Sequence, residues 1–164
     1  MGAAFQSGLI RSRGKKMEWI SNSEQETMEK AKALGEKLKG GELITLDGDL
    51  GAGKTAFVKG LAKGLGIEEM VVSPTFTIVR EYGGEKKLAH FDVYRIADPD
   101  EMFEIGFEEY LGGEWICVIE WAERIRDLLP QERLEIKIVR QGEGRQFFVR
   151  PGKGYEALSE VFEK

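Results

Sequence analysis

The chain has 164 residues, of which 41% are hydrophobic, and its formal net charge is -5 at pH 7. This length suits a single domain with one core, and the negative balance excludes a protein that binds nucleic acid through a global basic field. No apolar run approaches the roughly eighteen residues of a membrane-spanning helix. The single cysteine, Cys117, cannot pair within the chain, so we expect a buried thiol in a reducing, cytoplasmic setting.

The first sixteen residues differ in composition from the rest of the chain. They contain basic residues, no acidic residue and scattered apolar residues, and the charges follow the apolar residues. A secretory signal has the opposite order, with its charges before a continuous apolar core. We therefore predict that residues 1–16 are a disordered extension and that residues 17–164 form a single domain. A basic arm that touches RNA is the alternative.

The N-terminal part of the domain is predicted to start with a short strand and a helix. Residues 18–20 are β-like, and the helix extends to about residue 39. Its N-cap is Asn22 or Ser23, and Glu26 stands three residues after Ser23, as in a capping box.

Residues 48–55 read GDLGAGKT, a complete G-x-x-x-x-G-K-[ST] phosphate-binding loop. The loop stands between a β-like run over residues 43–46 and a helical pattern over residues 55–65. In such a loop the backbone N–H groups and the helix N-terminus face the phosphates, Lys54 reaches the β/γ oxygens, and the Thr55 hydroxyl holds Mg²⁺. The chain is therefore predicted to bind a nucleoside triphosphate. The loop residues predicted to contact it are Asp49, Leu50, Gly51, Ala52, Gly53, Lys54, Thr55 and Ala56.

The remaining elements are predicted from hydrophobic periodicity and turn residues. They are a β-hairpin over 75–82 and 86–94, a helix from 98 towards 111, a buried strand over 115–120, a short helix ending near 130, paired edge strands over 134–140 and 145–150, and a last helix over 155–162. This mixture predicts an α/β fold, a P-loop NTPase-like three-layer sandwich with a central parallel sheet and antiparallel additions at its margin.

Glu120 is the first candidate for a second functional acid. It ends a continuous apolar strand, where a Walker-B carboxylate lies if that strand neighbours the one before the phosphate-binding loop. We predict that Glu120 is a Mg²⁺ ligand; the alternative is a side chain that simply faces solvent.

The segment HFDVYR, residues 90–95, supplies a second set of polar groups. On a strand His90, Asp92 and Tyr94 share one face, while Phe91 and Val93 face the core. Asp92 can orient a water molecule or reach Mg²⁺ through one, and His90 can hold Asp92 in place. The alternative is an ordinary solvated face.

The segment SPTF, residues 73–76, is predicted to be a rigid bend between the phosphate-binding helix and the hairpin. Pro74 fixes its own φ and disfavours a helical Ser73. Ser73 and Thr75 would then lie where P-loop proteins commonly carry switch segments, although this pattern also suits any turn.

The segments GDLGAGKT, SPTF, HFDVYR and IEW, in this order and spacing, resemble the TsaE family, also called YjeE. The resemblance extends from about residue 19 to residue 150. It implies a P-loop ATPase domain over residues 17–164, slow alone, that needs ATP and Mg²⁺. It also implies action with TsaB and TsaD proteins in forming threonylcarbamoyladenosine beside the anticodon of tRNA. Hydrolysis would support repeated turnover of that complex, which would itself make the contact with tRNA.

The resemblance also implies roles for individual residues. Lys54, Asp92 and Glu120 would be catalytic, and Thr55 with Glu120 would hold Mg²⁺. The remaining implied residues are Trp121, close to the nucleotide; Ser23, Glu24 and Thr27, near its base; Ser73 and Thr75, in a switch-like bend; and His90 and Tyr94, in support. One departure is Ala56, where a second hydroxyl residue often follows the motif.

Two other classes of protein remain as alternatives. A small-molecule or nucleoside kinase needs a second pocket and an arginine-rich lid, whereas Arg80 and Arg95 are isolated. A non-catalytic ATP-sensing module for a partner would not require both Asp92 and Glu120. A GTP-dependent switch is less suitable because the chain has no Asn-Lys-x-Asp segment.

Overall fold

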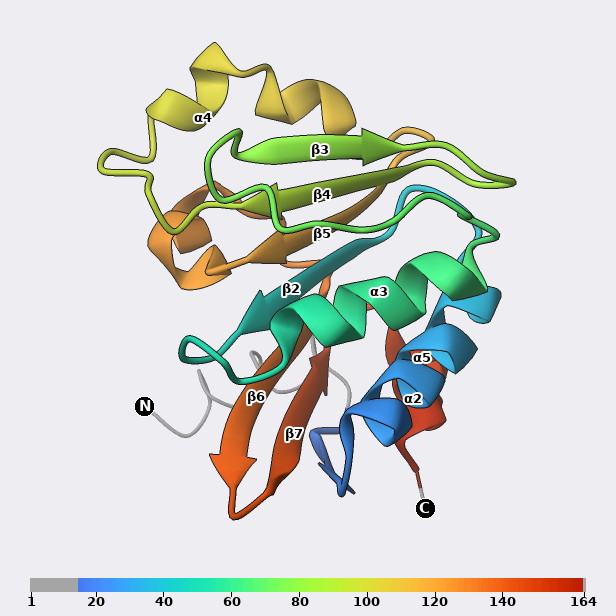
Figure 1. Ribbon diagram of the computed structural model, residues 1–164. Coiled ribbons are helices and arrows are strands. Elements are labelled where there is room, and N and C mark those ends of the chain that lie inside the picture. The colour runs from blue at the N-terminus through green and yellow to red at the C-terminus, as the bar shows by residue number, and fades with distance from the viewer. Residues whose placement is uncertain (1–14, 164) are drawn as a thin grey trace, which may run out of the picture.

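The structure is a computed structural model that describes residues 15–163, so most of the predicted N-terminal extension lies outside the described residues. The described chain folds around a seven-stranded sheet with the order β1-β7-β6-β2-β5-β4-β3 (Figure 1). Its strands are β1 (Met17–Ser21), β2 (Leu43–Asp47), β3 (Val79–Tyr82), β4 (Leu88–Asp92), β5 (Ile116–Glu120), β6 (Leu134–Gln141) and β7 (Gly144–Pro151). The helices are α2 (Glu24–Lys37), α3 (Lys54–Gly64), α4 (Glu101–Glu104) and α5 (Glu156–Ser159), with 3-10 turns η1 (Phe107–Tyr110), η2 (Ala122–Leu128) and η3 (Glu160–Phe162).

The four central strands are parallel and the outer ones antiparallel. β2 pairs in parallel with β5 and β6, and β4 pairs in parallel with β5. β3, β7 and β1 add antiparallel pairs at the two margins. The predicted P-loop NTPase-like sandwich is therefore confirmed. The prediction that the last two strands form an edge is wrong, because β6 lies against β2 and β1 covers β7.

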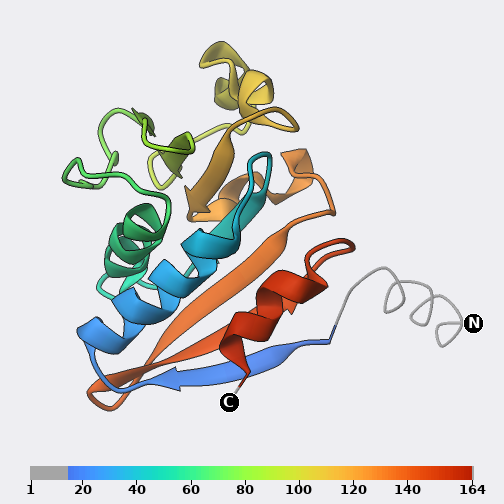
Figure 2. The same cartoon turned by 90° about the vertical axis from the view of Figure 1, so that its right-hand side faces the viewer.

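Helices cover both faces of this sheet, which gives three layers. α2, α3 and α5 lie together on one face, as the two views agree (Figures 1 and 2), while α4, η1 and η2 cover the other face over β4 and β5. Each face buries its own hydrophobic cluster.

The Cys117 thiol is buried as predicted, and burial raises its pKa to about 12, so the thiolate that makes a cysteine reactive is scarce.

Strand alternation decides which side chains face α3. On β5, Val118 belongs to the cluster under α2 and α3, whereas Ile119 belongs to the opposite cluster. Successive side chains alternate between faces, so Glu120 is directed towards the α3 side. The same alternation on β4 directs Asp92 to that side, and the two acids are register partners at the carboxyl ends of neighbouring strands.

Three predicted elements are shorter than the sequence pattern indicates. The hairpin begins at Val79 rather than at 75, because the Pro74 carbonyl accepts the N–H groups of Thr77 and Ile78 and holds a turn there. The helix expected from 98 to 111 is divided into α4 and η1 at Gly106, whose φ of 72° is left-handed. The C-terminal helix is α5 followed by η3.

No helix within residues 15–163 combines the length and apolarity needed to cross a membrane.

The contact between α2 and α3 depends on glycine. A Cβ placed on Gly60 would lie 2.3 Å from the backbone oxygen of Met28 and 2.8 Å from its Cα. Backbone atoms cannot move aside as the end of a flexible side chain can, so any larger residue would force the helices apart.

We expect Gly60→Ala to lower the free energy of unfolding by about 2 kcal/mol. Overpacking costs about 1–3 kcal/mol, and a clash with backbone atoms belongs at the upper end of that range. Subtracting the gain of roughly 1 kcal/mol from alanine's helix propensity leaves about 2 kcal/mol. Gly83→Ala is the control, because nothing lies within 4 Å of its Cβ position, and its effect should stay within about 0.5 kcal/mol. Urea unfolding followed by circular dichroism measures both; equal stabilities would contradict the close-packed contact.

Candidate functional site

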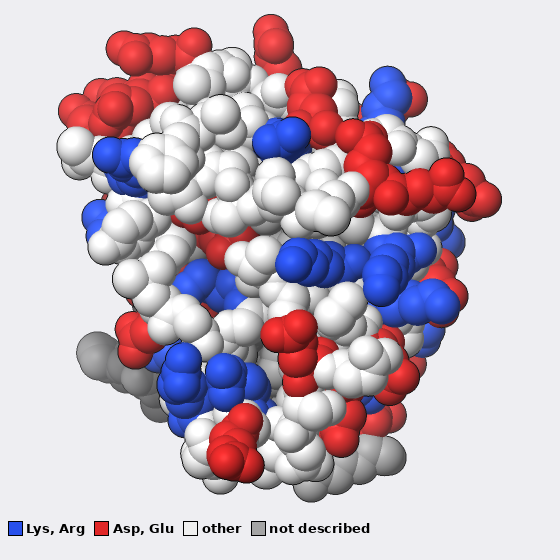
Figure 3. All heavy atoms as spheres, viewed as in Figure 1, with Lys and Arg blue, Asp and Glu red and all other residues white. Residues whose placement is uncertain are grey.

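The phosphate-binding loop leaves the carboxyl end of β2 and leads into α3. Gly53 forms the N-cap of α3 with a φ of 108°, a conformation that glycine adopts readily. The loop borders a cavity of about 340 Å³. On this side of the molecule basic and acidic side chains meet in a recess (Figure 3). The lining residues are Glu24, Leu50, Gly51, Ala52, Gly53, Lys54, Thr55, Ala56, Lys59, Ser73, Thr75, Asp92, Glu120, Trp121 and Arg145.

Most residues predicted from the motifs are in this lining, but five are not. Asp49, Ser23, Thr27, His90 and Tyr94 lie outside it. Two of the lining residues, Lys59 and Arg145, were not predicted.

Lys54 is the buried cation of the site, with 6% of its surface exposed. Its ammonium donates to the carbonyl oxygens of Gly48 and Asp49 and lies 4.1 Å from the centre of the Trp121 ring. Burial lowers the pKa of Lys54, while the charges of Glu120 and Asp92 act in the opposite direction. Trp121 reaches this position because its backbone turns left-handed (φ 62°) directly after β5.

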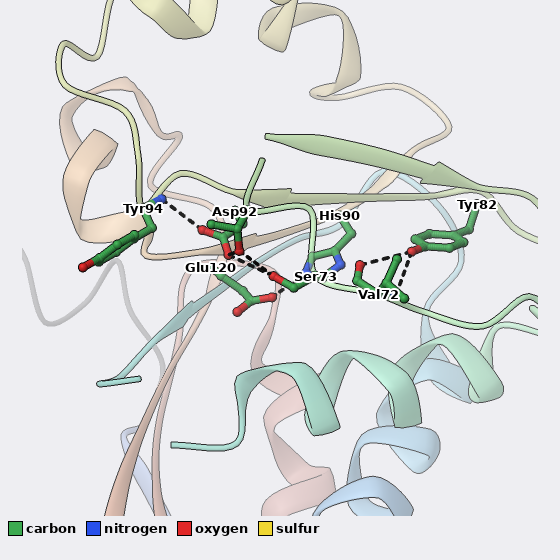
Figure 4. A network of polar contacts seen from close by, with 8 residues as sticks. Val72, Ser73, Tyr82, His90, Asp92, Tyr94 and Glu120 are labelled. Atoms are coloured by element: carbon green, nitrogen blue, oxygen red, sulfur yellow. Dashed lines mark hydrogen bonds and ion pairs between the residues drawn. The ribbon is translucent and has the colours of Figure 1, made fainter. Parts of the chain in front are cut away.

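Asp92 is held by the bend that precedes β3. Its Oδ2 lies within hydrogen-bond distance of the hydroxyls of Ser73 (3.2 Å) and Thr75 (3.0 Å), which lie 2.8 Å from each other. Each hydroxyl has one proton to donate, so two of these three contacts are hydrogen bonds at any moment. Its backbone N–H donates to the carbonyl of Ile78, whose φ of 72° is an unusual conformation for a β-branched residue. The SPTF bend and Asp92 therefore form one connected unit, seen close by in Figure 4.

His90 contacts the other acid. Its Nε2 lies 2.5 Å from Oε2 of Glu120, and both side chains are buried. The prediction that His90 holds Asp92 is wrong, because the hydrogen-bond partner of the ring within the described residues is Glu120 on the neighbouring strand.

Tyr94 does not extend the face of His90 and Asp92. β4 ends at Asp92, whose Oδ1 accepts the Tyr94 N–H at 3.0 Å. The Tyr94 side chain points away from Asp92 (Figure 4), and its ring lies 4.8 Å from the Trp121 ring. The Tyr94 ring therefore supports the indole of the site, whereas its contact with the carboxylate is made by the backbone N–H alone.

Arg145, at the start of β7, braces the phosphate-binding loop from the opposite side. Its Nε donates to the carbonyl of Ala52 at 2.8 Å and its Nη2 to the carbonyl of Gly51 at 3.1 Å. Nothing in the local sequence marks this arginine, because its position depends on how the β6–β7 hairpin returns to the sheet.

The N-terminus of α2 forms a smaller hollow next to the main cavity. Its volume is about 210 Å³, and it shares Glu24, Gly53, Ala56 and Arg145 with the main cavity. Ser23 and Thr27 line this hollow. Ser23 is the N-cap of α2 and its Oγ accepts the Glu26 N–H, as predicted, while the buried Thr27 hydroxyl lies 2.7 Å from that of Ser21.

The oxygen groups in the main cavity suit a magnesium ion whose other ligands are phosphate oxygens. No group of three or more histidine, cysteine or acidic side chains forms a metal site within residues 15–163. Mg²⁺ is usually held by one or two carboxylates together with substrate phosphates. The Thr55 hydroxyl and the Glu120 carboxylate fit this smaller requirement.

Comparison with known proteins identifies the family of the chain. The family model described as "Threonylcarbamoyl adenosine biosynthesis protein TsaE" matches residues 21–147, well over half of the chain. The chain belongs to the TsaE family.

Relatives of this TsaE-family chain cover most of it. The tRNA threonylcarbamoyladenosine biosynthesis protein TsaE of Bacillus subtilis is 46% identical over 149 residues, 89% of this chain and 93% of the relative. The protein of the same name from Treponema pallidum is 45% identical over 122 residues, 74% of this chain and 90% of the relative. The crystal structure of Bacillus subtilis YdiB matches with a TM-score of 0.78 and 42% identity, and covers 90% of this chain and 94% of that one.

Proposed function

We propose that this TsaE-family protein is a Mg²⁺-dependent ATPase of tRNA threonylcarbamoyladenosine biosynthesis that acts with TsaB and TsaD proteins. One observation carries the proposal: Lys54 of a complete phosphate-binding loop shares a cavity with two acids, Glu120 and Asp92, from adjacent parallel strands. Nucleotide binding alone would need only the loop. The names of the relatives support the place of the reaction in biosynthesis of the modified tRNA.

In the proposed reaction each residue of the site has its own role. The loop N–H groups and Lys54 bind the phosphates, and Thr55 and Glu120 hold Mg²⁺. The ion, when bound, neutralises charge on the phosphate oxygens. Asp92 orients the attacking water, and the hydroxyls of Ser73 and Thr75 keep its carboxylate in one orientation. The bend that carries these hydroxyls would respond to the nucleotide through Asp92.

The neighbouring hollow at α2 supports a position for the nucleoside. It opens on the same loop residues, Gly53 and Ala56, and is bounded by Glu24 and Arg145. The base would lie there while the phosphates occupy the loop, with Trp121 on the phosphate side above Lys54.

Hydrolysis by the chain alone is expected to be slow. Among the residues lining the described cavity the one arginine is Arg145, and its guanidinium is bonded to loop carbonyls. In other P-loop proteins an added arginine raises turnover by about 10³-fold or more. We propose that TsaB and TsaD proteins complete the site, or order the SPTF bend, and so raise the rate.

The test is Mg²⁺-dependent ATP hydrolysis by the full chain, alone and with its TsaB and TsaD counterparts. We expect slow phosphate release that rises with the partners and stops when EDTA removes Mg²⁺. Rapid hydrolysis without a partner effect, or transfer of phosphate to a small-molecule acceptor in a panel, would contradict the proposal and favour a kinase.

Arg145→Ala should weaken binding of a non-hydrolysable ATP analogue about tenfold, equivalent to ~1.4 kcal/mol. Both loop carbonyls lose their donor, so the loop no longer holds its shape before binding. Arg145→Lys should recover only part of the affinity, because one ammonium cannot reproduce two diverging N–H groups. Arg150→Ala, on an exposed part of β7, is the control for calorimetric titration; equal affinity in the Arg145 and Arg150 variants would exclude the bracing role.

A further inference from the structure

His90 is buried in the layer between the sheet and α3 without lining the nucleotide cavity. The side chain is 0% exposed, and its strand neighbour in register is the apolar Val118. A histidine placed among apolar residues loses hydration, which costs free energy unless its polar atoms find partners. The only partner it has in the described part of the chain is Glu120, at 2.5 Å.

The pattern of contacts indicates which ring nitrogen carries the proton. Nδ1 is buried and has no hydrogen-bond partner within residues 15–163. Nε2 faces a carboxylate oxygen, which accepts hydrogen bonds, so the proton of a neutral ring belongs on Nε2. Nε2–H then donates to Oε2 of Glu120.

This contact restricts Glu120 at the point where the site needs one orientation. A glutamate has three side-chain torsions, and the last one is broad, so a carboxylate at a strand end can present its oxygens in several ways. The hydrogen bond from His90 holds Oε2 in place, and Oε1 accepts no hydrogen bond from the residues that the structure describes, so it remains able to bind an ion. Second-layer hydrogen bonds of this kind to metal ligands commonly change metal affinity by about 10–100-fold.

We infer that His90 is a positioning residue for Glu120, and that its Nε2–H sets the carboxylate orientation in which Glu120 accepts Mg²⁺ with the nucleotide. The inference rests on the proposed function and deepens it. It assigns the histidine of HFDVYR to the metal side of the site, separate from the water-orienting Asp92 two residues later in the same strand.

Two amide variants distinguish the effect of the hydrogen bond to Glu120 from the effect of side-chain packing at residue 90. Gln places its amide nitrogen at the same number of bonds from the backbone as Nε2 of histidine, whereas Asn places it one bond nearer, at the level of Nδ1. His90→Gln can therefore still donate to Glu120, and His90→Asn cannot. Both are buried polar residues, so general disturbance of the core is similar, and thermal unfolding shows that each variant is folded.

The measured quantity is the gain in affinity for a non-hydrolysable ATP analogue when Mg²⁺ replaces EDTA, determined by calorimetry. We expect this gain to fall tenfold or more in His90→Asn and to stay within about threefold of the unchanged protein in His90→Gln. Affinity in EDTA should be the same in all three proteins, because His90 does not line the phosphate cavity.

The inference is overturned if His90→Asn keeps the full Mg²⁺ gain, or if His90→Gln loses as much as His90→Asn. An equal loss of affinity in EDTA would also overturn it, since that result indicates a distorted loop rather than a misplaced carboxylate. Should His90→Asn not fold, His90→Gln must still retain the gain that Glu120→Ala loses. An unchanged protein that gains nothing from Mg²⁺ would instead remove the proposed function, which keeps the two failures distinguishable.

Discussion

Replacing Glu120 by glutamine should reduce Mg²⁺-dependent ATP hydrolysis about a hundredfold or more while leaving the nucleotide affinity measured in EDTA unchanged. The amide keeps the shape of the side chain and can still accept the hydrogen bond from His90. It removes the negative charge that would hold the metal, and a bound metal contributes several kcal/mol to stabilising charge in the transition state. Affinity remains because the phosphates are bound chiefly by the loop and Lys54.

Glu123→Gln is the matched control for this experiment. Glu123 lies three residues later, in η2, is exposed, and does not line the cavity. Phosphate release should be measured with and without the TsaB and TsaD counterparts, and analogue affinity by calorimetry. If Glu120→Gln retained full partner-stimulated hydrolysis, the assignment of Glu120 as a metal ligand would be wrong.

The sequence predicts the centre of the fold well because local and long-range signals agree there. Residues 116–119 are a continuous apolar run that Glu120 ends, and the strand they form is buried along its whole length between two parallel neighbours. The glycines of the phosphate-binding loop permit the positive φ angles that Gly48, Gly51 and Gly53 adopt between the strand and the helix. The margins are less predictable, because antiparallel pairing of β1 with β7 depends on distant segments whose patterns are short.

The difference between local patterns and contacts between distant segments also decides which parts of the site the sequence predicts. Alternation along β4 and β5 is a local property, so the shared orientation of Asp92 and Glu120 follows from their positions at strand ends. Contacts between strands are not local. The pairing of His90 with Glu120 depends on the register of β4 against β5, and Arg145 reaches the loop only through the β6–β7 hairpin. Tyr94 lies past the end of its strand, where alternation no longer applies.

Lys54→Ala should weaken binding of ATP or its analogue by on the order of a hundredfold, the largest effect on affinity that we expect. Hydrogen bonds from a charged donor are each worth about 1.5–3 kcal/mol, and Lys54 is expected to contact both the β- and γ-phosphates. The loss of affinity is larger still because Lys54 is the buried cation that faces the carboxylates of Glu120 and Asp92. Without it the two carboxylates would repel the incoming phosphates.

Lys59→Ala provides the control for charge alone. Lys59 lines the rim of the same cavity from α3, but it is exposed to solvent, so screening should limit its effect to about threefold. Titration can be followed by Trp121 fluorescence, because the indole lies directly against the Lys54 ammonium, and calorimetry gives an independent value. Affinity close to that of the unchanged protein in Lys54→Ala would mean that the nucleotide phosphates bind elsewhere. An equal loss in both variants would reduce the role of Lys54 to long-range attraction, whereas a loss confined to Lys54 supports direct contact with the phosphates.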